Sequence, residues 1–154
     1  MGLSLEFYAG DAETIGADFT AHRFGGLRDG TRARAYADFS LHLSPTDLDI
    51  LSEVLAERAG VAPLLLNDSL VRTVGGTVDS SGAEVVDPAW VRLVAALDEA
   101  AAPELTAEWI KRVGAEYGQQ FDVTPDAVRA VGELIRLCRT AVSEGLEVVH
   151  TWYL

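Results

Sequence analysis

Hydrophobic positions near the C-terminal end of the chain follow the spacing of a helix and then of a strand. In residues 124–145, apolar residues recur at steps of three and four, which places them on one helical face. Thr124 is a good cap residue, Pro125 suits the first turn, and Gly145 suits the end of a helix. Residues 146–154 are rich in β-branched and aromatic residues and are mostly apolar on both faces. This composition predicts a strand in the middle of a sheet.

Strict alternation of apolar and polar residues marks two further strands. In residues 33–43 every odd-numbered position is apolar and every even-numbered position is polar. Residues 3–8 alternate in the same way, with Leu3, Leu5 and Phe7 on one side. Because successive side chains of a strand point to opposite faces, each segment is predicted to have one buried and one solvated face.

Helix starts are marked by a cap residue followed by proline, which needs no N–H in the first turn. These pairs are Ser44-Pro45, Asp87-Pro88 and Thr124-Pro125. With the apolar stripes, they predict helices over residues 12–21, 45–59, 88–99, 104–118 and 125–145. Residues 23–30 contain two glycine turn pairs and are predicted as a loop.

Residues 61–86 leave two interpretations open. Residues 61–69 fit a short apolar helix or an extended segment. Residues 70–74 and 84–86 are predicted as short strands. The glycines and serines between them favour a hairpin with a mobile tip.

The order of these elements predicts an α+β fold in a single domain, residues 1–154. We expect a small, mostly antiparallel sheet packed by about five helices on one face. Its strands lie near residues 3–8, 33–43 and 146–153, with a possible hairpin at 70–86. A doubly wound parallel sheet is not expected, because strands and helices do not alternate regularly. The alternative is a mainly helical domain with a small terminal sheet.

Composition restricts the partners and the compartment. The formal net charge is −12, which disfavours nucleic acids and anionic membranes, since both require basic patches. It permits a basic protein partner. No segment has the apolar length of a membrane span, and the first residues do not resemble a signal peptide. With Cys138 as the only cysteine, these features predict a cytoplasmic location. Arginine in place of lysine, with abundant alanine, valine and glycine, suggests a bacterial source.

The polar positions of the three predicted strands form the best candidate site. If the strands are neighbours, one sheet surface carries acids, tyrosines, an arginine and a histidine. His42 is the candidate general base, which Asp38 or Glu6 would orient, and Tyr36 is the fourth catalytic candidate. The candidate ligand-binding residues are Arg34, Tyr8 and Tyr153. The other interpretation is the ordinary wet face of an antiparallel sheet, held by cross-strand polar pairs.

Packing explains the remaining reactive residues better than chemistry does. The three histidines have no metal-site spacing, so no metal and no cofactor is predicted. His150 stands among apolar residues, and Cys138 lies on the apolar side of its helix, so both are expected to be buried. The three tryptophans fit core positions.

These patterns favour a non-enzymatic protein-interaction module. Its docking surface would be the polar sheet face or an acidic stripe on the predicted helix 45–59, formed by Asp49, Glu53 and Glu57. Size, acidity and α+β pattern are similar to those of toxin-neutralising immunity proteins, a likeness of architecture without a motif. The alternative is a small enzyme or ligand-binding domain on the polar face around His42. A concave pocket holding His42, Asp38 and a tyrosine would favour that alternative.

Overall fold

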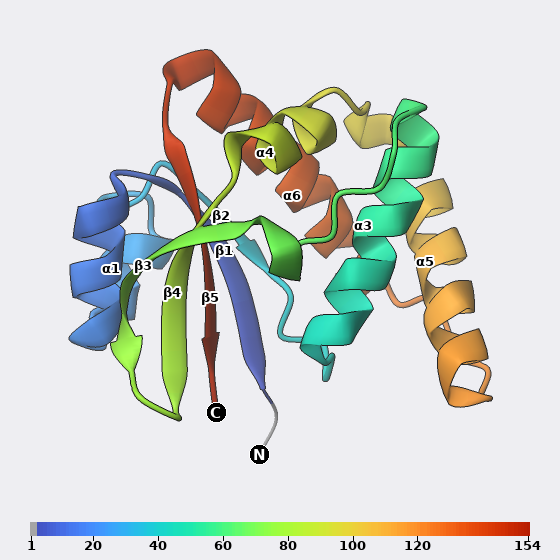
Figure 1. Cartoon of the computed structure of the whole chain (residues 1–154), viewed down its shortest axis with the longest axis horizontal. Coiled ribbons are helices and arrows are strands. Elements are labelled where there is room, and N and C mark those ends of the chain that lie inside the picture. Colours follow the sequence, from blue (N-terminus) through green and yellow to red (C-terminus); the bar gives the residue numbers. More distant parts are fainter. Residues whose placement is uncertain (1–2) are drawn as a thin grey trace.

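The fold is a five-stranded antiparallel sheet with helices, as described for residues 3–154 in a computed structural model (Figure 1). The strands are β1 (Ser4–Gly10), β2 (Ala35–Asp38), β3 (Leu70–Thr77), β4 (Ser81–Val86) and β5 (Glu147–Tyr153). The α-helices are α1 (Ala12–Thr20), α2 (Phe24–Arg28), α3 (Pro45–Ala59), α4 (Pro88–Ala95), α5 (Ala102–Tyr117) and α6 (Pro125–Glu144). Two 3-10 turns are η1 (Asn67–Ser69) and η2 (Glu99–Ala101). The predicted α+β class is confirmed.

β5 occupies the centre of the sheet, whose strand order is β2-β1-β5-β4-β3. It pairs antiparallel with β1 on one side and with β4 on the other. Its residues from Val148 to Thr151 are buried, although they point alternately to both faces. The prediction of a central C-terminal strand and of a hairpin in residues 70–86 is therefore confirmed.

The two faces of the sheet carry separate hydrophobic cores. On one face, Leu5, Phe7 and Val148 pack beneath α3, α4, α5 and α6. On the other face, Tyr8 and Val149 pack with α1 and α2. Figure 1 shows this division, with α1 on one side of the strands and α3, α5 and α6 on the other. The helix arrangement thus differs from the prediction, which placed the helices on one face.

α1 lies on the second face because glycines allow its backbone to approach β3 closely. A Cβ atom on Gly16 would come within 2.2 Å of the Val74 carbonyl oxygen. A Cβ atom on Gly75 would come within 2.4 Å of the Gly16 carbonyl oxygen. Only glycine permits such an approach. Ile15 and Phe19 then bury the apolar side of α1 against the sheet.

The predicted strand over residues 33–43 is wrong in length, since only Ala35–Asp38 form β2. Glu6 is opposite Asp38, so a longer β2 would run past the start of β1. The chain instead turns at His42, whose φ is 61°. The apolar residues after the strand still reach the large core, but they do so from a loop.

The predicted loop over residues 23–30 is also wrong, because it contains the short helix α2. Tertiary contacts hold this segment in place. The Asp18 carboxylate, which is buried in α1, accepts hydrogen bonds from Arg23 at 2.8 Å and from Arg32 at 2.7 Å, on either side of α2. These bonds lower the pKa of Asp18. Leu27 of α2 is fully buried, so the helix also contributes to the second core.

The helix starts predicted at Ser44, Asp87 and Thr124 are confirmed, but the predicted helix 88–99 ends at Ala95 and α5 begins at Ala102 instead of residue 104. Thr124 caps α6 by accepting from the Ala127 N–H at 3.2 Å, and Ser44 and Asp47 form a capping box at the start of α3. Gly145 ends α6 with a left-handed φ of 66°. Among the helices within residues 3–154, none has the combined length and apolarity needed to cross a bilayer.

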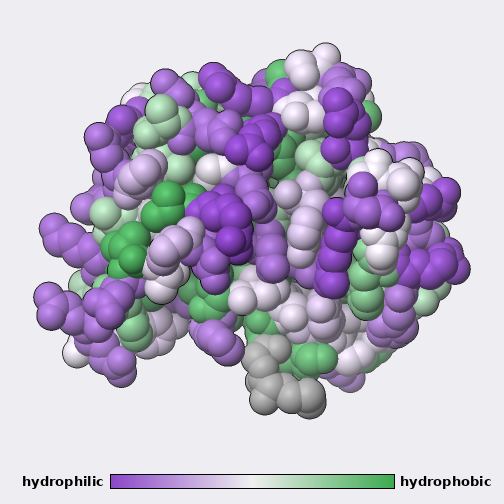
Figure 2. Space-filling view, turned by 180° about the vertical axis from the view of Figure 1, so that it is seen from behind, coloured by the Kyte–Doolittle hydropathy of each residue, from purple (hydrophilic) through white to green (hydrophobic). Residues whose placement is uncertain are grey.

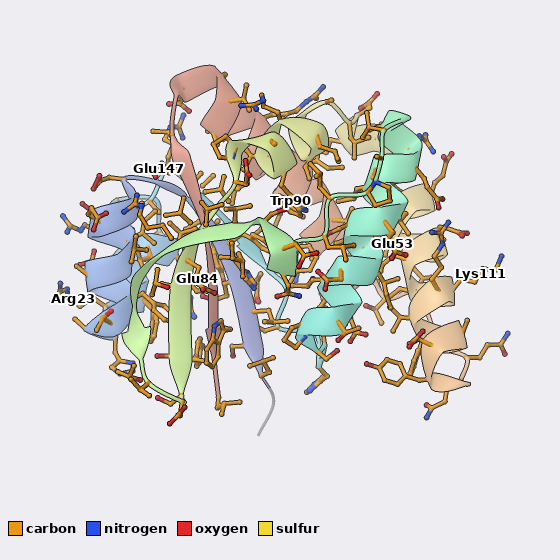
Figure 3. The ribbon with its side chains drawn as sticks, in the orientation of Figure 1. Arg23, Glu53, Glu84, Trp90, Lys111 and Glu147 are labelled. Carbon is orange, nitrogen blue, oxygen red and sulfur yellow. The ribbon has the colours of Figure 1, made fainter. Side chains whose placement is uncertain are left out.

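The residues expected to serve packing are largely buried. Trp90 points from α4 into the core (Figure 3), where it stacks on Phe7 and donates to the Ser52 hydroxyl at 3.2 Å. Cys138 is fully buried, and burial raises the pKa of its thiol. The His150 ring is buried, and its Nδ1–H donates to the Glu6 carbonyl oxygen at 3.0 Å.

Shortening a buried side chain at the junction of α6 and the sheet should destabilise the protein. Leu134 and Val148 are at most 1% exposed, so Leu134→Ala should cost about 2–4 kcal/mol and Val148→Ala somewhat less, because each opens a cavity. Urea unfolding measures the cost. The control is Val142→Ala, which alters a half-exposed position on α6 and should change stability by about 0.5 kcal/mol or less. A loss below about 0.5 kcal/mol at both core sites would contradict this packing.

Buried His150 should make folding stability depend on pH. Burial lowers its pKa to about 4 in the folded chain, against 6.5 for an unperturbed histidine, while the bond to Glu6 acts in the opposite direction. Between pH 6.5 and about pH 4, His150 of the unfolded chain binds a proton that His150 of the folded chain does not. The free energy of unfolding therefore decreases as the pH falls through this range. In urea unfolding at pH 7 and pH 5, His150→Gln should show a smaller difference than wild type. Exposed His22→Gln should behave like wild type, and an unchanged difference in His150→Gln would exclude this origin.

Candidate functional site

Several of the predicted site residues form one cluster around the buried carboxylate of Glu6. Its carboxylate, on β1, accepts from the Tyr8 hydroxyl, from Arg28 Nη2 at 2.5 Å and from the Tyr36 hydroxyl at 3.3 Å. Arg28 Nη2 also donates to the Tyr153 hydroxyl at 3.3 Å. We call Glu6, Tyr8, Arg28, Tyr36 and Tyr153 the Glu6 cluster.

Strand register and α2 together assemble the Glu6 cluster. Glu6 and Tyr8 are two positions apart on β1 and therefore share a face. The pairing of β1 with β2 places Tyr36 opposite Tyr8, and their rings stack at 5.1 Å between centroids. α2 places the Arg28 guanidinium over this face, 5.9 Å from the centre of the Tyr36 ring. The sequence-predicted polar face is thus covered by α1 and α2, and much of it is buried.

Electrostatics explains why the cluster is stable in a buried setting. Burial and the adjacent Glu6 carboxylate raise the pKa of both Tyr8 and Tyr36, so the two phenols stay neutral and donate hydrogen bonds. Burial alone would lower the pKa of Arg28, but the charge of Glu6 and the hydrogen bonds with Tyr153 and Tyr8 together outweigh it, and the pKa rises. The Glu6 carboxylate is therefore paired with a cation and hydrogen-bonded through both oxygens. A carboxylate engaged in this way is a poor general base.

The structure places His42 apart from the other predicted site residues, whereas Arg34, Tyr36 and Asp38 line one groove beside α2 and α6. Asp38 lies on β2 and accepts from the Ser40 N–H at 2.8 Å, whereas Arg34 pairs with Glu144 of α6 at 3.1 Å. His42 lies in the exposed turn beyond β2. The predicted partnership of His42 with Asp38 or Glu6 is therefore not formed. Within residues 3–154, no three His, Cys, Asp or Glu side chains are grouped as a metal site requires.

His42 instead lines a groove of about 670 Å³ between the start of α3, the α5 helix and the segment before α6. We call it the α5 groove. Its apolar lining residues are Leu41, Leu43, Ile110, Val113, Phe121 and Ala127. In the back view of Figure 2, hydrophobic surface gathers on the side of the molecule where α5 lies. A concave, mainly apolar site of this volume is typical of a binding site.

A polar network fixes one wall of the α5 groove. The Asp47 carboxylate is buried at the start of α3 and accepts from the Ser44 N–H at 2.8 Å and from the Tyr117 hydroxyl at 3.1 Å. The Trp109 indole donates to the Asp47 carbonyl oxygen at 2.8 Å. The capping box of α3 therefore also holds the end of α5, which carries Tyr117, in place.

The charge of the α5 groove is negative. Its lining residues include Asp47 and Asp122 but no lysine or arginine. Lys111 follows Ile110 on α5, but its side chain points away from the protein (Figure 3). A ligand that enters this groove meets apolar surface and the exposed Asp122 carboxylate, whereas the Asp47 carboxylate is buried and already hydrogen-bonded.

Most of the acidic side chains in the stripe predicted on α3 already accept hydrogen bonds from other residues of the chain. Asp49 accepts from the Asn67 N–H at 3.0 Å. Glu57 accepts from Arg112 through both oxygens, at 3.0 and 2.5 Å, and these bonds lower its pKa. Glu53 is half-buried on α3 (Figure 3). The stripe is therefore less open to a partner than its sequence suggests.

Sequence reasoning missed Arg28 and the groove residues of α5 and α6. Arg28 stood in a predicted loop, with no local signal that it faces the sheet. Tyr117 and Phe121 are close in sequence, but the wall opposite them comes from Leu41 and Leu43, about seventy-five residues earlier. Only the tertiary fold brings these segments together.

No family model, no curated protein and no solved structure matches this chain.

The ion pair between buried Glu6 and partly exposed Arg28 should respond unequally to loss of its two partners. Arg28→Gln leaves the Glu6 carboxylate buried without a cation, which should cost about 3–5 kcal/mol. Glu6→Gln should cost less, about 1–3 kcal/mol, because Arg28 is 37% exposed and water can solvate it.

Urea unfolding of both variants tests this order. Arg58→Gln is the control, because it removes an arginine from an exposed pair with Glu104 and should cost about 1 kcal/mol or less. Equal losses for Arg28→Gln and Glu6→Gln would contradict the asymmetry.

Proposed function

We propose that the protein is a non-enzymatic interaction module that binds a basic, amphipathic segment of a partner protein in the α5 groove. The observation that carries the proposal is the combination of an apolar groove with an acidic lining that contains no lysine or arginine. The net charge of −12 supports the same kind of partner, because long-range attraction speeds the encounter with a cationic segment.

Exposed aromatic side chains at the groove support a protein partner. Tyr117 and Phe121 are 48% and 44% exposed, and nearby Val123 is 44% exposed. The two aromatic rings meet edge to face, 6.4 Å apart. Exposed apolar clusters of this kind commonly mark interaction sites, and aromatic residues dominate the binding energy of many interfaces.

The acids near these rings support a basic partner. Asp122 lies between Phe121 and Val123, so a carboxylate stands among the exposed apolar side chains. A helix or extended segment with apolar residues on one side and lysine or arginine beside them would match this pattern. The toxin-neutralising role that the sequence suggests is one form that such binding can take.

We also propose that the protein is located in the bacterial cytoplasm. A bacterial cytoplasmic protein fits the arginine-rich composition and the single cysteine, which is buried and reduced.

A small enzyme or ligand-binding domain that uses His42 is the second candidate. His42 lines the α5 groove with a φ of 61°, and residues other than glycine that adopt this strained conformation concentrate at functional sites. In this case a small molecule would compete with a peptide for the groove, and His42→Ala would abolish the competition.

Peptide binding tests the interaction proposal. The probes are a labelled amphipathic peptide of leucine and lysine and its leucine–glutamate counterpart, followed by fluorescence anisotropy. The basic peptide should bind the wild type, and Phe121→Ser should weaken binding by at least about tenfold because it removes an exposed aromatic contact.

Val78→Ser is the matched control, because Val78 is 90% exposed at the β3–β4 turn and lies outside the α5 groove. This variant should bind like wild type. Equal binding by wild type and Phe121→Ser would assign the affinity to general charge attraction and reject the groove. Equal binding of the two peptides would reject the preference for a basic partner.

A further inference from the structure

A second groove, of about 450 Å³, gathers a third of the basic residues of the chain. It lies between α2, β2 with the segment before it, and α6. Four of its twelve lining residues are arginines, namely Arg28, Arg34, Arg129 and Arg136. In a chain with twelve basic residues among 154, twelve positions would hold about one by composition alone. We call this the arginine groove.

We propose that the arginine groove binds a small polyanion, an organic molecule that carries a phosphate or several carboxylate groups. Guanidinium groups present planar pairs of N–H donors that match both kinds of oxyanion. The volume of the groove suits a small molecule. It shares no lining residue with the α5 groove, so the two sites can be tested separately.

Arg28 is the preorganised member of the groove. Its Nη2 is held by the buried Glu6 carboxylate at 2.5 Å, and its guanidinium lies 5.0 Å from the centre of the Phe24 ring. Nη2 also makes the bond to Tyr153, and an arginine has five N–H donors. Arg28 therefore keeps donors for a ligand while its position is fixed by the Glu6 cluster.

The other three arginines are held by pairs that a ligand can replace. Arg34 pairs with Glu144 at 3.1 Å, and Arg129 pairs with Asp126 at 2.9 Å. Arg136 pairs with Glu99. These arginine side chains are 59–64% exposed, and exposed pairs contribute only about 0–1 kcal/mol each. Exchange of such a pair for a bound oxyanion therefore costs little.

The acids that line the groove are fewer than the arginines, and each already accepts a hydrogen bond or pairs with an arginine, Glu133 with Arg129 at 3.5 Å. They are Asp29, Asp38 and Glu133. The Asp29 carboxylate accepts from the Thr31 N–H at 2.9 Å, and Asp38 accepts from the Ser40 N–H at 2.8 Å. The lining therefore carries four formal positive charges and three negative ones, on a protein of net charge −12.

Isothermal titration calorimetry of the full chain at low ionic strength tests the proposal, with pyrophosphate and citrate as separate probes. At least one probe should bind saturably at one site. Preference for pyrophosphate would identify a phosphate ligand, and preference for citrate would identify a polycarboxylate. The double variant Arg34→Gln/Arg136→Gln should weaken binding by at least about tenfold, because it removes two charge-assisted contacts. It retains Arg28, so the buried cluster stays intact.

The matched control is Arg58→Gln/Arg92→Gln, which removes the same charge from two exposed arginines outside the groove. Its affinity should remain within about twofold of wild type. Equal weakening by both double variants, or no saturable binding of either probe to wild type, would overturn the proposal.

Amide NMR shifts of the wild type on titration provide a test independent of the variants. Shifts confined to residues 27–38 and 129–136 are expected, and shifts confined elsewhere would reject the site.

Discussion

The sheet depends on the hydrogen bonds that β5 makes along both of its edges. β1 and β2 form one antiparallel pair, and β3 and β4 form a hairpin. β5 is the strand that joins these two units, through seven register pairs with β1 and five with β4. Because it is the last element of the chain, the sheet closes only when residues separated by most of the sequence meet. Contacts of this range carry a large loop-closure entropy and slow folding.

The central position of β5 also explains why the two faces of the sheet differ. α6 leads directly into β5, so the long helices pack on the face where Val148 and Trp152 contact the large core. The opposite face is covered by two helices only, α1 and α2, of nine and five residues. A smaller apolar cover leaves room for a polar cluster, and Glu6 can be buried there because Arg28 and two phenols supply its hydrogen bonds. Burial of a charge is tolerated under these conditions only.

The two grooves have opposite chemistry and arise from different parts of this arrangement. The α5 groove forms where the α3 cap, the end of α5 and the start of α6 meet, and it is apolar with acidic lining residues. The arginine groove forms where α2 and β2 meet α6, and the Glu6 cluster fixes one of its arginines from below. α6 therefore contributes to both grooves as well as to the core. A partner in one groove and a small polyanion in the other would contact the same helix, near its first turn and its middle.

The sequence by itself determined the elements with strong local signals. Caps, prolines and glycines marked α3 and α6, and the apolar composition of residues 146–154 identified a central strand. These signals act within a few residues, so periodicity reveals them. The tertiary structure alone decided three further points: the early end of β2, set by the length of β1; the position of α1 and α2 on the second face; and the partners of each polar residue. The sequence did predict one surface shared by Glu6, Tyr8, Tyr36 and Tyr153, because the alternation of side chains along a strand is a local property. The pairing of Arg28 with Glu6 could not be predicted, and neither could the position of His42 away from that surface. Both depend on contacts between segments far apart in the chain.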